Sequence, residues 1–188
     1  VAADVISFNS AIAAVAKAKG QGDQWERAVS LLEAMKKAGI APTTVTYNAV
    51  INACAKCGEW EKALSLLDEM KKACTDENDE LSPDSVSYNS CIAALAKCGQ
   101  WVPALSLLNE MKSSGLADVI SFNSAITACE KGGRWQKALY LLEEMDAAGI
   151  DRDVYTYSSA ISACEKGGQW ERALSLLSEM RSAGVKPN

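Results

Sequence analysis

The chain has 188 residues, 48% of them hydrophobic, and a formal net charge of −5 from 19 basic and 24 acidic side chains. This length is sufficient for a substantial core, and no apolar run of 18 residues or basic-apolar leader indicates a membrane span or a secretory signal. An acidic balance counts against a nucleic-acid partner. However, one stretch supplies four of the five net negative charges, so the rest of the chain is nearly neutral: Asp76, Glu77, Asp79 and Glu80.

The cysteine and histidine counts exclude most catalytic chemistry. There are seven cysteines and no histidine. An odd number of cysteines spread through apolar stripes indicates free, buried thiols in a reducing compartment. The missing histidine removes the commonest general base and the commonest metal ligand. Cys54 and Cys57 form a lone CxxC without a second pair, so we expect no metal, no cofactor and no enzymatic activity.

A sequence motif of about 35 residues recurs five times, which is typical of a solenoid. Residues 1–4 read as the tail of a preceding repeat, and five repeats follow: 5–43, 44–84, 85–118, 119–153 and 154–188. The first carries four extra residues in its central turn, and the second carries an acidic insertion near 75–81. The chain begins without Met and ends on the last residue of a repeat, so we expect it to be part of a longer protein.

Each repeat reads as a helical hairpin. In the last repeat, apolar residues at three- and four-residue spacing predict a first helix: Val154, Tyr157, Ile161 and Cys164. Gly167 and Gly168 then predict a turn. A second stripe predicts the second helix, which Gly184 and Pro187 end: Trp170, Ala173, Leu174, Leu177 and Met180. Neither helix can bury its stripe alone, so the sequence predicts an all-α stack of helix-turn-helix repeats.

Large apolar side chains recur at the two ends of every second helix. A tryptophan opens each one (Trp25, Trp60, Trp101, Trp135 and Trp170), and a methionine closes it (Met35, Met70, Met111, Met145 and Met180). Aromatic and methionine stripes at helical spacing usually pack in the core. We therefore interpret both sets as structural.

Two polar positions recur as well. The fifth residue of each repeat is Asn9, Asn48, Asn89, Asn123 or Ser158. Asparagine is a poor helix former, so it either bonds to nearby backbone or presents a solvent-facing amide that matches the edge of a base. The last residue of each repeat is Thr43, Asp84, Asp118, Asp153 or Asn188. These types suit the N-cap of the next helix, and capping does not exclude a contact with a base.

A lysine occupies the thirteenth position of every repeat: Lys17, Lys56, Lys97, Lys131 and Lys166. A cation near a helix C-terminus interacts favourably with the helix dipole. The same column of five ammonium groups also suits an extended phosphate backbone, and we favour that interpretation.

The openings VTYNAVINAC and VSYNSCIAAL, the closing AGVKPN and the 35-residue period resemble pentatricopeptide repeat proteins over essentially the whole chain. Tetratricopeptide repeats, which generally bind peptides, have a period of 34 and different signature positions. The resemblance implies a right-handed α-solenoid that binds single-stranded RNA with one base per repeat. It also implies residence in a mitochondrion or chloroplast. A protein-binding adaptor or structural subunit of an organellar complex is the alternative.

The resemblance assigns a base to each pair formed by the fifth and last residues of a repeat. Asn48/Asp84, Asn89/Asp118 and Asn123/Asp153 imply uracil, Ser158/Asn188 implies adenine, and Asn9/Thr43 implies a pyrimidine. The expected U-rich site is 5′-YUUUA-3′. Each base would lie between apolar side chains of consecutive repeats, and the lysine column would contact phosphates. These base-sandwiching residues would be Ile6, Val45, Val86, Ile120 and Tyr155.

Overall fold

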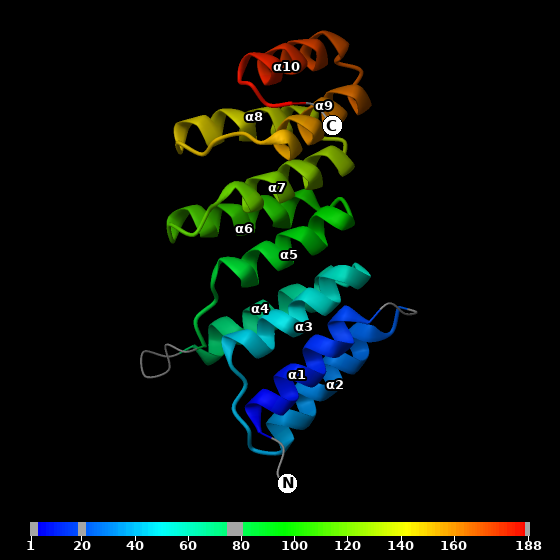
Figure 1. Ribbon diagram of the computed structural model, residues 1–188, viewed down its shortest axis with the longest axis vertical. Helices are drawn as coiled ribbons and strands as arrows, with labels where there is room; N and C mark the ends of the chain where they lie inside the picture. Colours follow the sequence, from blue (N-terminus) through cyan, green and yellow to red (C-terminus); the bar gives the residue numbers. More distant parts are fainter. Residues whose placement is uncertain (1–3, 19–21, 75–80, 187–188) are drawn as a thin grey trace. The chain divides into compact units, whose positions relative to one another are not determined.

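Ten α-helices, with no β-strand, form the part of the chain that the computed structural model describes, residues 4–18, 22–74 and 81–186 (Figure 1). In chain order they are α1 (Val5–Lys17), α2 (Gln24–Lys37), α3 (Thr44–Cys57), α4 (Trp60–Ala73), α5 (Ser85–Lys97), α6 (Trp101–Ser113), α7 (Val119–Lys131), α8 (Trp135–Ala147), α9 (Val154–Lys166) and α10 (Trp170–Ser182). The all-α helical-repeat fold is therefore confirmed. None of these helices is long and apolar enough to cross a bilayer.

The helices form two compact units, Val1–Ala94 and Leu95–Asn188, and the boundary between them falls within α5. In the first unit, α1 packs against α2 and α3, and α3 also packs against α2 and α4. In the second unit, α7 packs against α6, α8 and α9, and α9 also packs against α8 and α10. In both units, the first helix of one hairpin therefore lies against the first helix of the next.

The first helix of a hairpin starts where a short polar side chain caps it. Asp153 accepts a hydrogen bond from the backbone N–H of Thr156, and the Thr156 hydroxyl accepts one from the backbone N–H of Asp153. This reciprocal capping satisfies two donors that a helix start otherwise leaves unpaired. Thr43 and Asp118 cap α3 and α7 in the same way.

The two glycines of the central turn have different roles. Gly168 has φ of +68°, a left-handed conformation that glycine adopts without a steric penalty. Gly167 has an ordinary φ of −85°, but a Cβ at this position would lie 2.2 Å from Cδ1 of Trp135 in the preceding hairpin. One glycine therefore makes the turn, and the other leaves room for a tryptophan.

The predicted packing of the methionines is confirmed, because Met35, Met70, Met111, Met145 and Met180 are all buried. The tryptophan prediction is wrong for Trp170, which is 66% exposed, and Leu174 on the same stripe is also exposed. Trp101 and Trp135 are half-buried because the glycine turn of the following hairpin packs on each of them. No later helix packs on Trp170 within the described residues. Three other predictions concern residues outside the described ranges: the acidic insertion near 75–81, the end of the last helix at Pro187 and base reading by Asn188.

Candidate nucleic-acid interface

The second, fifth and thirteenth residues of each first helix share one face of that helix. An α-helix turns by about 100° per residue, so the thirteenth residue lies about 20° from the second, and the fifth about 60° to the other side. The three positions span an arc of about 80° and about 16 Å of helix length. We call this surface of α1, α3, α5, α7 and α9 the first-helix face.

An exposed apolar side chain recurs on the first-helix face of every hairpin, and we call these five side chains the apolar column. The second residue of every first helix is a large apolar side chain, and its exposed fraction is between 53% and 73%: Ile6, Val45, Val86, Ile120 and Tyr155. Burying a side chain of this size stabilises a protein by about 1.5–3 kcal/mol, a contribution that these five do not make. Single exposed apolar residues are ordinary, but the same exposed position in five successive hairpins indicates a surface for an apolar or aromatic ligand.

Asn48 and Asp84 lie side by side at the junction of two hairpins. The Asn48 amide donates from Nδ2 to Oδ1 of Asp84 at 3.0 Å and approaches Oδ2 at 3.3 Å. The buried hydroxyl of Ser87 donates to Oδ1 of Asn48 at 2.5 Å, and the backbone N–H of Ser87 donates to Asp84 at 2.9 Å. The amide is thus half-buried and held by its neighbours.

Asn123 and Asp153 repeat this arrangement in the second unit. Nδ2 of Asn123 donates to Oδ1 of Asp153 at 3.0 Å, and the Thr156 hydroxyl donates to Oδ1 of Asn123 at 2.6 Å. Asn9 follows the same rule, because its Oδ1 accepts from the hydroxyl of Thr46 at 2.7 Å. Neither interpretation of these asparagines was fully right: their amides bond to side chains of the next hairpin, instead of to local backbone or to solvent alone.

Both aspartates of these pairs are ionised at neutral pH. Burial alone would raise the pKa of Asp84, but hydrogen bonds from the Ser87 N–H and the Asn48 amide lower the pKa below its ordinary value. The pKa of Asp153 is lowered against the same effect of burial, chiefly by donation from Thr156 and Asn123. Each carboxylate therefore acts only as a hydrogen-bond acceptor.

For the other predicted base-reading residues, the structure gives the position of each side chain by itself. Asn89 is half-buried on α5, and Asp118 caps α7 with a hydrogen bond of 2.8 Å from the N–H of Ser121. Ser158 is exposed on α9. Asn188, its predicted partner, is outside the described residues.

The lysine column is exposed in all five hairpins. Three of the lysines reach back to the preceding first helix: Nζ of Lys56 lies 2.8 Å from the carbonyl of Ala16, Nζ of Lys131 lies 3.4 Å from the carbonyl of Lys97, and Lys166 bonds to Glu130. Two of the contacts are to C-terminal carbonyls, as the helix-dipole interpretation requires, although of the neighbouring helix. An exposed ammonium group with three protons can also contact a phosphate.

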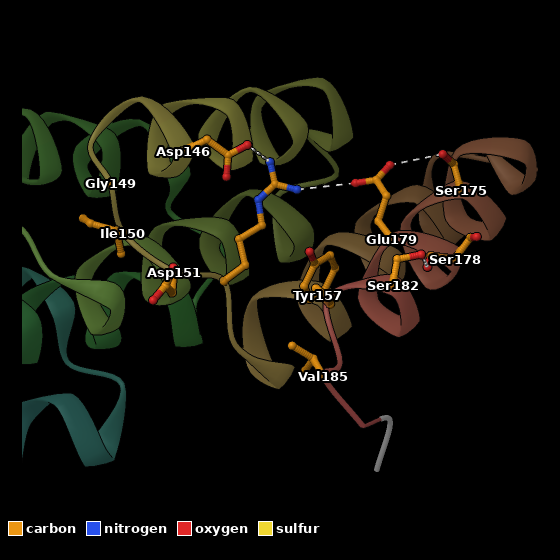
Figure 2. Close-up of a pocket in the computed structure, with 12 residues that line it drawn as sticks. Asp146, Gly149, Ile150, Asp151, Tyr157, Ser175, Ser178, Glu179, Ser182 and Val185 are labelled. Carbon is orange, nitrogen blue, oxygen red and sulfur yellow. Dashed lines mark hydrogen bonds and ion pairs between the residues drawn. The ribbon is translucent and has the colours of Figure 1, made fainter.

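A separate open hollow of about 950 Å³ lies between the end of α8 and α10 (Figure 2). Asp146 and Glu179 approach one guanidinium from two sides, that of Arg152, which also donates to the carbonyl of Leu142 at 3.1 Å. Asp151 adds a third carboxylate to the lining. Three carboxylates would repel a phosphate group, and the one arginine is already bonded to two of them. This hollow is therefore not part of the candidate interface.

Four of the seven cysteines are buried as expected (Cys54, Cys91, Cys129 and Cys164), whereas Cys57 and Cys74 are only half-buried. Burial raises the pKa of Cys54 and Cys129 to about 11 and that of Cys91 to about 12, which keeps these thiols protonated and unreactive. Cys98 is exposed, contrary to the prediction of buried thiols. Within the described residues, no group of three or more potential metal ligands occurs.

Comparison with known families gives matches along most of the chain. The PPR repeat model matches residues 45–74 and 155–185, and the PPR repeat family model matches residues 3–56, 83–117 and 117–166. No curated protein that was compared matches the chain.

Solved structures with this fold include the pentatricopeptide repeat protein PPR10 from maize, at 27% identity and a TM-score of 0.75. PPR10 in complex with an 18-nt psaJ RNA element matches at 26% identity and a TM-score of 0.81. Both matches cover 100% of this chain and 26% of PPR10, so the chain spans about a quarter of that protein's length. The PPR domain of Arabidopsis thaliana protein-only RNase P 1, in complex with tRNA, matches at 13% identity and a TM-score of 0.77, over 98% of this chain and 92% of that domain. At this identity the last match shows the fold alone.

Proposed function

Because the chain belongs to the pentatricopeptide repeat family, we propose that it binds single-stranded RNA along the first-helix face, one base per repeat, without catalysis by this segment. The observation that carries the proposal is the repeated association of an amide and an ionised carboxylate, in Asn48/Asp84 and Asn123/Asp153, beside the exposed apolar column. PPR10, whose structure with RNA has this fold, supports the same function.

The chemistry of the pair favours uracil. An ionised carboxylate accepts a hydrogen bond from N3–H of uracil, whereas N3 of cytosine is itself an acceptor and would be repelled. The Asn123 amide carries two hydrogens on Nδ2, and Asp153 takes only one of them. The second is left to donate to O4 of uracil. The pairs Asn48/Asp84, Asn89/Asp118 and Asn123/Asp153 would thus each read uracil.

The proposed site remains 5′-YUUUA-3′, with the bases stacked between neighbours of the apolar column and the phosphates near the lysine column. A base stacked on such side chains contributes about 1–3 kcal/mol. Five bases, after the cost of ordering a flexible strand, give modest affinity. If five phosphates are neutralised, log K should fall against log salt with a slope of about −3.5.

The experiment is a binding titration with RNAs that differ in one base. Asn123→Ser combined with Asp153→Asn should change the preferred fourth base from uracil to adenine and leave the other positions unchanged. The matched control is Asn48→Ser combined with Asp84→Asn. In this variant the preferred second base should change from uracil to adenine, and the preferred fourth base should remain uracil. Equal binding to poly-U and poly-C, or a salt slope near zero, would refute the proposal.

Purification of the same protein tests the alternative function. A protein partner at constant stoichiometry, with no bound RNA in the absorbance ratio at 260 and 280 nm, would support an adaptor instead. Residence in a mitochondrion or chloroplast, which the family implies, is tested by fractionation of cells that express the full-length protein.

A further inference from the structure

At the start of α7 the Ser121 hydroxyl donates to the carbonyl of Asp118 at 2.6 Å. At three other junctions a buried hydroxyl stands behind an asparagine. It belongs to the third residue of the following first helix: Thr46 behind Asn9, Ser87 behind Asn48 and Thr156 behind Asn123. The three O···O distances to the amide oxygen are 2.7, 2.5 and 2.6 Å. All three hydroxyl residues are fully buried, so water does not compete for these bonds.

Of the two acceptors near the Thr156 hydroxyl, the amide oxygen of Asn123 is the closer one. The oxygen of Thr156 accepts the backbone N–H of the capping residue Asp153 at 3.1 Å. Its own proton can reach Oδ1 of Asn123 at 2.6 Å or Oδ1 of Asp153 at 3.0 Å, and the shorter contact is to the amide. The hydroxyl therefore donates to the amide oxygen. An amide held in this way has its NH₂ group on the side away from the hydroxyl.

We propose that Thr46, Ser87 and Thr156 are positioning residues that set base specificity by fixing the orientation of the asparagine in the preceding repeat. This inference rests on the proposed RNA-binding function. A fixed amide presents a donor to the base, which suits O4 of uracil and opposes the exocyclic NH₂ of cytosine. A freely rotating amide can turn by 180° and present its oxygen to cytosine equally well.

The hydrogen bond from this hydroxyl to the asparagine matters most at the first base. At Asn48 and Asn123, an aspartate carboxylate also attracts the NH₂ group and so supports the same orientation. At Asn9 the corresponding residue is Thr43, whose hydroxyl contacts Thr46 at 3.1 Å. Thr46 is therefore the residue that orients this amide. The pyrimidine expected at the first base is consequently uracil, and its selection over cytosine depends on one hydroxyl.

The test compares Thr46→Val with Thr46→Ser. The valine variant keeps the shape and removes the hydroxyl, and we expect the preference for U over C at the first base to fall by about three- to tenfold, the value of one hydrogen bond. The serine variant keeps the hydroxyl and should keep the preference. Ser87→Ala should have a smaller effect at the second base, because Asp84 still orients Asn48.

Loss of a helix cap alone must be separated from loss of orientation. Ser7→Ala removes a hydroxyl at the same third position of α1, where Ser7 bonds only to Asp4 among the described residues. It should lower helix stability without a change in U over C preference. A change of equal size in Ser7→Ala and Thr46→Val would overturn the inference.

A second measurement does not need RNA. In the wild-type protein, the Nδ2 protons of Asn9 lie on the far side of the amide from residue 46, so their nuclear Overhauser effects to its side chain should be weak. Thr46→Val should strengthen these effects by letting the amide turn, and Thr46→Ser should not. If the wild type binds RNA but Thr46→Val changes neither the base preference nor these effects, the inference fails and the proposed function stands. If the wild type binds no RNA, the proposed function fails, and these effects alone decide whether the hydroxyl orients Asn9.

Discussion

Nζ of Lys166 lies 2.7 Å from Oε1 of Glu130, a carboxylate on the preceding first helix whose side chain is 14% exposed. Ser162 donates to the same oxygen at 2.9 Å. Glu130 is the twelfth residue of its repeat, beside the lysine position, so this carboxylate borders the first-helix face. Ala16, Ala55 and Ala96 occupy the twelfth position in the first three repeats. The lysine column is therefore not uniform, because one of its members has a carboxylate partner that a phosphate would have to displace.

Glu130→Gln should strengthen RNA binding. The change removes a negative charge near the phosphate path and releases the Lys166 ammonium group, so affinity should rise by about two- to fivefold at low salt. The gain should disappear as salt screens these charges. Glu144→Gln is the matched control, because Lys112 bonds to Glu144 at the same 2.7 Å on the second helices α6 and α8. An equal gain in both variants would mean that only net charge matters and that the first-helix face is not the binding surface.

Val45→Ser should weaken RNA binding without loss of stability. Val45 is 64% exposed, so its replacement should change the free energy of unfolding by no more than about 0.5 kcal/mol. A base stacked against it would lose apolar contact, and affinity should fall by about three- to tenfold. Val102 on α6 is similarly exposed at 59% but lies on a second helix, so Val102→Ser should bind RNA like the wild type. Binding titrations and urea unfolding of both variants give the comparison. A loss of affinity in Val102→Ser alone would place the RNA elsewhere.

The fold was predictable because its signals are local and repeat five times. Period, apolar spacing and glycine turns determine the two helices of a hairpin, and each start has a capping residue such as Asp153. Exposure at the end of the array was not predictable in this way. Trp170 and Leu174 match half-buried counterparts such as Trp135 and Leu139 in sequence, but they are exposed because no later helix packs on α10 within the described residues.

The candidate site was predictable by position but not by partner. The sequence indicates that Asn123 and Asp153 recur at fixed places, yet 30 residues separate them, and their 3.0 Å contact depends on how α9 stacks on α7. The role of Thr156 was missed altogether. The sequence did contain a signal, since every first helix has Ser or Thr as its third residue. However, Ser and Thr at this position also suit a helix cap, and only the contact of Thr156 with Asn123 indicates a second role.

Gly167→Ala should destabilise the protein through a clash across the junction. The added Cβ would lie 2.2 Å from Cδ1 and 2.7 Å from Cγ of Trp135, so the ring must move, at a cost of about 1–3 kcal/mol. Gly149→Ala is the control for backbone strain, because Gly149 has φ of +67° and open space around its Cβ position. That change should cost about 1 kcal/mol. The free energies of unfolding come from urea titration.

A double-mutant cycle separates the clash from other effects of Gly167→Ala. In a Trp135→Leu background the smaller side chain leaves room for the new Cβ, so Gly167→Ala should cost clearly less than in the wild type. An identical cost in both backgrounds would show that the tryptophan is not the reason for glycine at this position.

Asp153→Asn should reveal a stability contribution that acid removes. Asparagine caps a helix about as well as aspartate, so the difference between the two proteins reports mainly the charge-assisted bonds from Thr156 and Asn123. The folded state lowers the pKa of Asp153, so this contribution is fully present above the unfolded pKa of about 3.9 and is lost as pH falls through the folded pKa. Wild type should exceed the variant in stability by about 1 kcal/mol at pH 7 and at pH 5, and the difference should shrink below about pH 4.

Urea unfolding at pH 7, 5 and 3.5 measures this difference. Asp151→Asn is the matched control, because the exposed Asp151 side chain makes no hydrogen bond within the described part of the chain, and its replacement should change stability little at any of the three pH values. A difference for Asp153→Asn that stays constant or grows down to pH 3.5 would contradict the assigned ionisation. Because the same carboxylate is proposed to accept N3–H of uracil, the preference for uracil at the fourth base should also be unchanged between pH 7 and pH 5. Loss of that preference over this range would mean that a group other than Asp153 reads the base.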